Sequence, residues 1–113
     1  MTSRNIALTE WEIAGSKIIS ENLFTLARNG RVFEILDLFR GGIDPDSMDK
    51  NGNTVLIIAC QNNHKDLARL CLQFNADINL KNNLNKSALH YTVQYNYPSL
   101  QSYLLKKGAN PNY

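Results

Sequence analysis

The sequence lacks the features of a secreted or membrane-spanning protein. Its longest apolar run, Val55 to Cys60, is far shorter than the roughly 20 residues that cross a bilayer. The N-terminus has no charged stretch followed by an apolar run and a cleavage site, so no secretory signal is recognised. Two cysteines in such a chain do not indicate a disulfide framework. We therefore predict an intracellular protein, with the cytoplasm as first choice and a nuclear or cytoskeletal location left open.

Patterns of catalytic, metal-binding or phosphate-binding residues are missing as well. Cys60 and Cys71 fall at apolar helix positions, where buried and unreactive thiols are expected. The acidic run of Asp44, Asp46 and Asp49 lacks the spacing and terminal glutamate of a calcium loop. No Cys/His spacing resembles a zinc site, and no glycine-rich phosphate loop is present. We predict no enzyme activity, no cofactor, no metal and no small-molecule substrate.

Strong net charge is also missing, although the charge is unevenly distributed. The formal net charge of +2 is too small to imply a nucleic-acid partner. Residues 1–50 contain six basic and eight acidic residues, whereas residues 51–113 contain six basic and two acidic ones. Nucleic-acid binding through the basic C-terminal half therefore stays open as a weak alternative.

What the sequence does contain is an internal repeat, whose period is the distance from Thr54 to Ser87. The segment Thr54–Ala59 (TVLIIA) recurs as Ser87–Thr92 (SALHYT). The segment Asn75–Asp77 recurs one period later as Gly108–Asn110 and matches Gly42–Asp44 one period earlier. A period of about 33 residues, with an opening similar to T-P-L-H-x-A, resembles the ankyrin repeat, in which a β-turn precedes two antiparallel helices.

The resemblance covers residues 20–113 and implies an all-α, right-handed solenoid of helix-turn-helix units with short β-turn fingers. We divide the chain into a lead-in segment (1–19), a first unit (20–48), a second unit (49–81) and a third unit (82–113). In the lead-in segment, Thr9 and Glu12 form a predicted helix capping box around Trp11. This segment is expected to cover the first unit, with a free amphipathic peptide as the alternative.

Several residues mark where the helices begin and end. Thr54 and Ser87 are predicted helix N-caps, and Ser20 is predicted to cap the first helix. Gly30 and Asn63 suit the left-handed conformation that ends a helix. By the family pattern, His64 and His90 occupy structural positions rather than metal-binding ones.

The two ends of the stack differ in pattern. Glu34 stands where the second unit has Leu67, and Asp37 stands where it has Leu70. The first unit is therefore expected to have a polar outer face that is exposed to solvent. The last helix pair is expected to expose Val93, Leu100 and Leu104 or their neighbours. Either this face tolerates water, or another chain or a continuation stacks on it, and both possibilities stay open.

The family geometry places the fingers and first helices on one concave side, which is the expected protein-binding surface. Carried over by position, the candidate residues are Met48, Lys50, Asn51, Asn53, Gln61, Asn62, Lys81, Asn83, Leu84, Lys86, Gln94 and Tyr95. The lysines would steer an acidic partner. Tyr95, Leu84 and Met48 are the candidate apolar anchors.

These observations favour a non-enzymatic protein-interaction module, either an adaptor or a subunit of a larger intracellular assembly. A small free-standing inhibitor of a kinase or a cytoskeletal protein is the alternative. The expected partner is another protein, with a possible stacking partner on the terminal faces, and neither a membrane nor a cofactor is expected.

Overall fold

The computed structural model describes residues 22–112. The predictions for Thr9, Trp11, Glu12 and Ser20 lie outside the described residues. Residues 22–28 are helical, and five further helices follow: α2 (Val32–Arg40), α3 (Val55–Gln61), α4 (Lys65–Gln73), α5 (Ala88–Gln94) and α6 (Pro98–Lys106).

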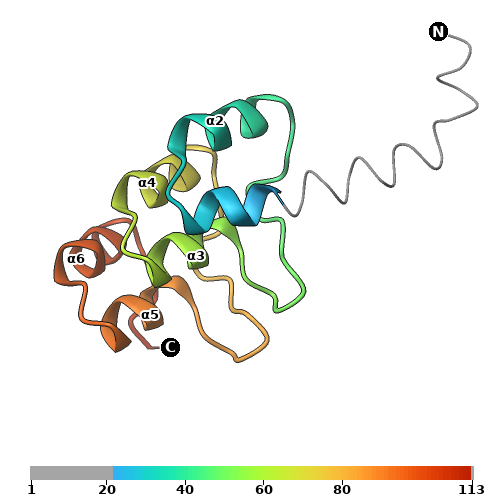
Figure 1. Ribbon diagram of the computed structural model, residues 1–113. Helices are drawn as coiled ribbons and strands as arrows, with labels where there is room; N and C mark the ends of the chain where they lie inside the picture. Colours follow the sequence, from blue (N-terminus) through green and yellow to red (C-terminus); the bar gives the residue numbers. More distant parts are fainter. Residues whose placement is uncertain (1–21, 113) are drawn as a thin grey trace, which may run out of the picture.

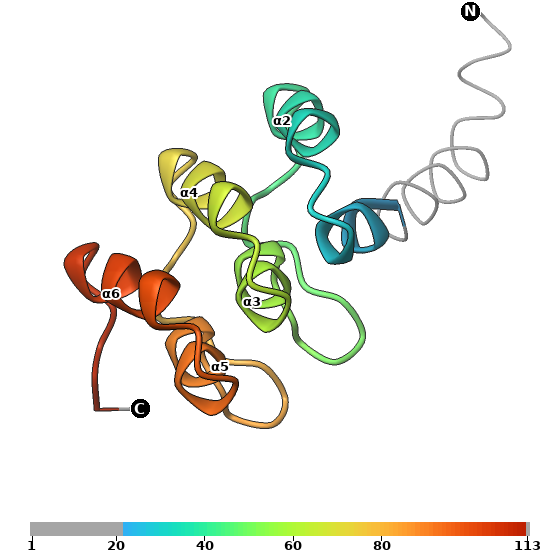
Figure 2. The ribbon, with the colours of Figure 1, turned by 60° about the vertical axis from the view of Figure 1, so that its left-hand side comes forward.

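The helices form two layers that are stacked unit by unit. Residues 22–28, α3 and α5 make one layer, and α2, α4 and α6 make the other (Figures 1 and 2). The loops that precede α3 and α5 project from the first layer as fingers (Figure 2). In the second finger, Lys81 and Ser87 form an antiparallel bridge, and residues 22–112 contain no longer strand. The predicted all-α repeat stack with short fingers is confirmed.

The backbone repeats the period seen in the sequence. Eight of the described residues have positive φ: Gly30, Asn63 and Asn96 after each first helix, Gly42, Asn75 and Gly108 after each second helix, and Gly52 and Asn85 in the fingers. Neighbouring members of each set lie one period apart. Because only glycine and, less readily, asparagine adopt this conformation at low cost, the repeat of Gly and Asn sets where the helices end.

Hydroxyl side chains start the first helices of the second and third units. The N–H of Ile57 donates to Thr54 Oγ1 (3.2 Å), and the N–H of His90 donates to Ser87 Oγ (3.4 Å). Each bond satisfies an N–H that has no partner within its own helix. The two predicted N-caps are therefore confirmed.

Side chains in the turn between the helices join each unit to the one before it. His64 Nε2 donates to the carbonyl oxygen of Arg28 (2.9 Å), and Tyr97 Oη donates to that of Gln61 (3.3 Å). The two donors are one period apart, and so are the two acceptors. Two different side chains therefore make the same bridge, and His64 has the structural role that was expected.

A second set of bridges joins the connections that follow the second helices. The N–H of Asp77 donates to Asp46 Oδ1 (2.9 Å), and the N–H of Asn110 donates to Asn79 Oδ1 (2.8 Å). These bonds are also related by one period. With two bridges at each junction, the orientation of neighbouring units is well determined.

The core lies between the layers and between the units. All six residues from Val55 to Cys60 are buried, as is Cys71 of α4. Leu100 and Leu104 are buried too, so the expectation that they are exposed at the end of the stack is wrong. They stand one period after Leu67 and Cys71 and belong to the same hydrophobic core.

The exposed apolar residues at the C-terminal end of the stack are Val93 of α5 and Leu105 of α6, with 42% and 41% of their surface accessible. They stand one period after Cys60 and Leu72. We call these two residues the C-terminal end face.

Candidate functional site

Each finger is shaped by the side chain at its base. Asp49 Oδ1 accepts from the N–H groups of Asn51 and Asn53, both at 2.9 Å. In the next finger Asn82 Oδ1 accepts from the N–H groups of Leu84 (3.0 Å) and Lys86 (3.1 Å). A carboxylate and an amide oxygen thus organise the same loop, because both can accept two hydrogen bonds.

The two fingers are bonded to each other. The N–H of Asn83 donates to the carbonyl oxygen of Asn51 (2.9 Å), and Asn83 Nδ2 donates to that of Lys50 (3.2 Å). Asn82 Nδ2 donates to Asn53 Oδ1 (2.8 Å). Gly52 makes this approach possible, since a Cβ there would lie 2.6 Å from Asn83 Oδ1 and 3.0 Å from its backbone nitrogen. The fingers therefore form one preorganised surface.

Three large apolar side chains stand exposed on the fingers and on the end of α5. Leu84 has 70% of its surface accessible, Met48 50% and Tyr95 47%. Lys50 and Lys81 of the fingers are exposed as well, and Lys86 is half-buried. The predicted anchors and the predicted lysines therefore belong to the two fingers and to the end of α5.

A row of tyrosines supports this surface in the third unit. The rings of Tyr91 and Tyr95 stack with centroids 6.0 Å apart, and Tyr95 lies 6.0 Å from Tyr97. Tyr91 is buried, and its hydroxyl accepts from Asn82 Nδ2 (2.8 Å). Lys86 Nζ lies 5.6 Å from the Tyr91 ring centroid. Sequence reasoning did not identify this row, although the four-residue spacing of Tyr91 and Tyr95 was a usable signal.

The remaining candidates are partly engaged within the chain. Asn62 is exposed, and its Nδ2 donates to the carbonyl oxygen of Ile58 (2.8 Å). Gln94 Oε1 accepts from Lys86 Nζ (3.0 Å), and Gln61 is half-buried. The whole predicted set is at least partly accessible, and we call these twelve residues the finger surface: Met48, Lys50, Asn51, Asn53, Gln61, Asn62, Lys81, Asn83, Leu84, Lys86, Gln94 and Tyr95.

The two thiols and one imidazole are perturbed by their surroundings. Burial raises the pKa of Cys60 and of Cys71 far above the usual range, so both thiols stay protonated. Desolvation, followed by the charges of Lys86 and Lys81, lowers the pKa of His90. Residues 22–112 hold no group of three or more His, Cys, Asp or Glu side chains suited to a metal ion.

Two further observations concern the described part of the chain as a whole. None of its helices combines the length and the apolarity that crossing a bilayer requires. Every buried side-chain nitrogen or oxygen there has a hydrogen-bond partner.

Stacked helix pairs with bonded fingers define a repeat scaffold that presents an extended surface to partners. A sequence model described as ankyrin repeats (3 copies) matches residues 23–113. The chain belongs to the ankyrin-repeat family, whose members are generally protein–protein interaction modules and typically not enzymes.

A protein from Arabidopsis thaliana, the ADP-ribosylation factor GTPase-activating protein AGD2, is 34% identical over 61 residues. The similarity covers 54% of this chain but 8% of the plant protein. The chain therefore matches less than a tenth of that relative.

Proposed function

We propose that the protein binds another protein through the finger surface, as an adaptor or as a subunit of a larger assembly. The observation that supports this most directly is the group of exposed apolar side chains, Leu84, Met48 and Tyr95, on bonded fingers. Covering such exposed apolar side chains with a partner is favourable, because it removes apolar surface from water.

The rigidity of the fingers adds to this argument. The bonds from Asn83 to Asn51 and Lys50 hold the second finger against the first before any partner binds. Preorganisation lowers the entropy lost on association. The exposed Lys50 and Lys81 would accelerate the approach of an acidic partner.

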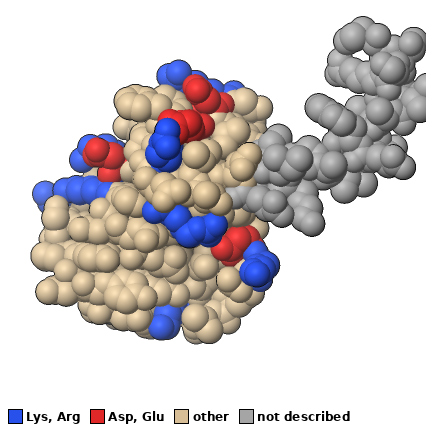
Figure 3. All heavy atoms as spheres, in the orientation of Figure 1, with Lys and Arg blue, Asp and Glu red and all other residues tan. Residues whose placement is uncertain are grey.

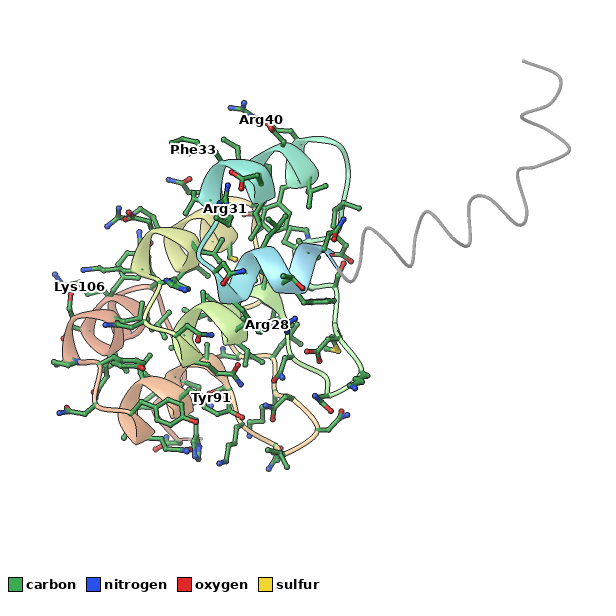
Figure 4. The ribbon with its side chains drawn as sticks, viewed as in Figure 1. Arg28, Arg31, Phe33, Arg40, Tyr91 and Lys106 are labelled. Atoms are coloured by element: carbon green, nitrogen blue, oxygen red, sulfur yellow. The ribbon has the colours of Figure 1, made fainter. Side chains whose placement is uncertain are left out.

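The proposal is tested with a matched pair of variants. Leu84→Ser combined with Tyr95→Ser removes two anchors, whereas Phe33→Ser removes an apolar side chain that is 78% accessible on α2. Phe33 lies in the first unit and Tyr91 in the third, at opposite ends of the stack (Figure 4). The partner is isolated from cell extract with the wild-type chain, purified and titrated against each variant.

We expect the double variant to weaken binding by about tenfold or more, as loss of hot-spot residues does. Phe33→Ser should change the affinity by less than about twofold, because side chains outside an interface contribute little. Equal effects of the two changes would mean that the partner does not use the finger surface.

The free-standing inhibitor remains the alternative form of this proposal. The two forms differ in stoichiometry, which light scattering of the purified complex measures. A 1:1 complex with loss of the partner's activity would favour an inhibitor. Incorporation into a particle of several chains would favour an assembly subunit.

Nucleic-acid binding is less well supported, because the basic side chains of the C-terminal half are divided. Lys81 and Lys86 belong to the fingers, whereas Lys65 and Arg69 belong to α4 in the other layer. Phosphate contacts would make the affinity fall steeply with salt. An affinity for DNA or RNA that falls steeply as the salt concentration rises, with no such fall for protein partners, would overturn the interaction-module proposal.

A further inference from the structure

Three cations surround one aromatic ring in the layer formed by α2, α4 and α6. Lys65 Nζ, Arg69 Cζ and Lys107 Nζ each lie 5.7 Å from the ring centroid of Tyr103. Lys65 and Arg69 belong to α4, Tyr103 to α6, and Lys107 caps the end of α6. We call these four residues the cation cluster.

The charge of this cluster is poorly compensated. Asp66 lies 3.3 Å from Arg69, and Lys65 Nζ donates to the neutral Ser99 hydroxyl (2.9 Å). Lys106, next to Lys107, is also exposed and extends from the end of α6 (Figure 4). Figure 3 shows basic atoms at the left-hand edge of the molecule, beside α4 and α6.

The cations are close enough to repel one another. Because each lies 5.7 Å from one centroid, any two are within about 11 Å, close to the Debye length of about 10 Å at 0.1 M salt. The face of the Tyr103 ring attracts cations through its quadrupole and offsets part of this repulsion. An anion placed among them would relieve the rest.

The cluster borders a hollow that has an apolar wall. The hollow has a volume of about 290 Å³ and is lined by Arg69, Leu72, Gln73, Tyr103 and Lys107. Leu72 is half-buried and packs against the core. The site therefore combines positive charge at the edge with room for an uncharged side chain inside.

We propose that this hollow between α4 and α6 is a second docking site, which takes a short acidic peptide segment of a partner protein. Carboxylates of the segment would face Lys65, Arg69 and Lys107, and an aliphatic or aromatic side chain would enter the hollow beside Leu72. Complementary charge draws the segment to the site, and the apolar contact holds it.

A peptide suits this site better than a lipid surface or a nucleic acid does. A flat membrane surface cannot enter a hollow between two helices, whereas a single side chain can. Nucleic acids need a track of cations along their backbone, and here three cations surround one ring. The finger surface lies on the other layer, so this proposal does not depend on the proposed function.

The test is a titration of the full chain with a fluorescent peptide of glutamates around one central phenylalanine. Lys107→Glu reverses a charge of the cluster, and the control Arg40→Glu makes the same reversal of charge at the exposed end of α2, which belongs to neither proposed surface. Tyr103→Leu removes the ring but restores the residue type at Leu70, one period earlier. Circular dichroism checks that each variant is folded.

We expect Lys107→Glu to weaken binding by about tenfold and Arg40→Glu by less than about twofold, because only the first charge contacts the peptide. Tyr103→Leu should weaken binding by about threefold or more, because the ring lines the hollow and holds the three cations together around it. Amide NMR shifts on adding the peptide should fall on α4 and α6.

Three results would overturn the proposal. One is equal weakening by Lys107→Glu and Arg40→Glu, which would mean unspecific attraction. Another is the absence of measurable peptide binding. The third is tighter, Lys107-dependent binding of anionic lipid vesicles or single-stranded DNA, which would assign the cluster to a different partner.

Discussion

The second and third units are built on one plan, but they differ in what covers them. Both begin with a capped first helix and a finger organised by one side-chain oxygen. In the second unit Cys60 is buried, whereas its counterpart Val93 has 42% of its surface exposed. The second unit lies between two others, and in the described residues the third has a neighbour on one side.

This difference teaches that the energetic role of a residue in a stack depends on the adjacent unit. Each unit buries its apolar face only against its neighbours. The same position is therefore core in one unit and surface in the next. Four experiments test this comparison.

The largest effect is expected when leucine is replaced by alanine at a buried position, in comparison with the same replacement at an exposed one. Leu67→Ala on α4 removes a fully buried side chain and should lower the free energy of unfolding by about 2–5 kcal/mol. Leu105→Ala on the C-terminal end face should cost under about 1 kcal/mol, since its side chain is already partly in water. Denaturant titration measures both. Similar losses would mean that the end face is covered, for example by self-association.

The buried thiols of the second unit should make stability depend on pH. In the folded chain Cys60 and Cys71 keep their protons at pH values where the unfolded thiols, with pKa about 8.5, lose them. The unfolded state then binds fewer protons, so stability is full below that pKa and falls as the pH rises above it. The slope approaches about 1.4 kcal/mol per pH unit for each thiol.

Urea titrations at neutral and alkaline pH measure this slope, and a Cys60→Ala/Cys71→Ala double variant should lack it. A Val93→Cys variant places a thiol in the third unit, one period after Cys60, and tests whether that position is accessible. Its thiol should react rapidly with a chromogenic disulfide reagent in the folded state, while Cys60 and Cys71 do not. Rapid reaction of the wild-type chain would contradict their burial.

The contact between the fingers is tested with two glycines. Gly52→Ala and Gly42→Ala each place a side chain at positive φ, which costs about 1–2 kcal/mol. Only at Gly52 would the new Cβ also meet Asn83, whereas at Gly42 it meets nothing within 4 Å. We expect Gly52→Ala to be more destabilising by about 1 kcal/mol, the value of a hydrogen bond. Equal losses would show that the fingers separate readily.

The smallest effect is expected from removal of the helix N-caps, which the second and third units share. Thr54→Ala and Ser87→Ala each remove a helix cap and should cost about 1 kcal/mol apiece. Thermal unfolding of the two variants measures both losses of stability, and these are then compared. A loss at Ser87 far below that at Thr54 would mean that the shared local plan stabilises the two units unequally.

The sequence predicted those features that lie within one unit. The repeat period, the caps Thr54 and Ser87, and the turn residues Gly30 and Asn63 were all recognisable, because each acts on backbone groups a few residues away. The unit boundaries and the binding role of the finger surface stay predictions.

Apart from the tyrosine row of the third unit, the features that were wrong or missed involve more than one unit. Leu100 and Leu104 were expected to be exposed but are buried, because apolar periodicity does not tell which neighbour a helix face meets. The cation cluster joins Lys65 of α4 to Lys107 at the end of α6, a relation that no spacing within one helix encodes.

The amino-acid sequence alone was sufficient for the kind of fold, the ends of the helices and the side of the stack that carries the fingers. The bridge from His64 to Arg28 and the difference between Cys60 and Val93 emerged from the assembled stack. The physical reason is range: caps, turns and helix periodicity are local, whereas burial and contacts between units depend on how the units pack.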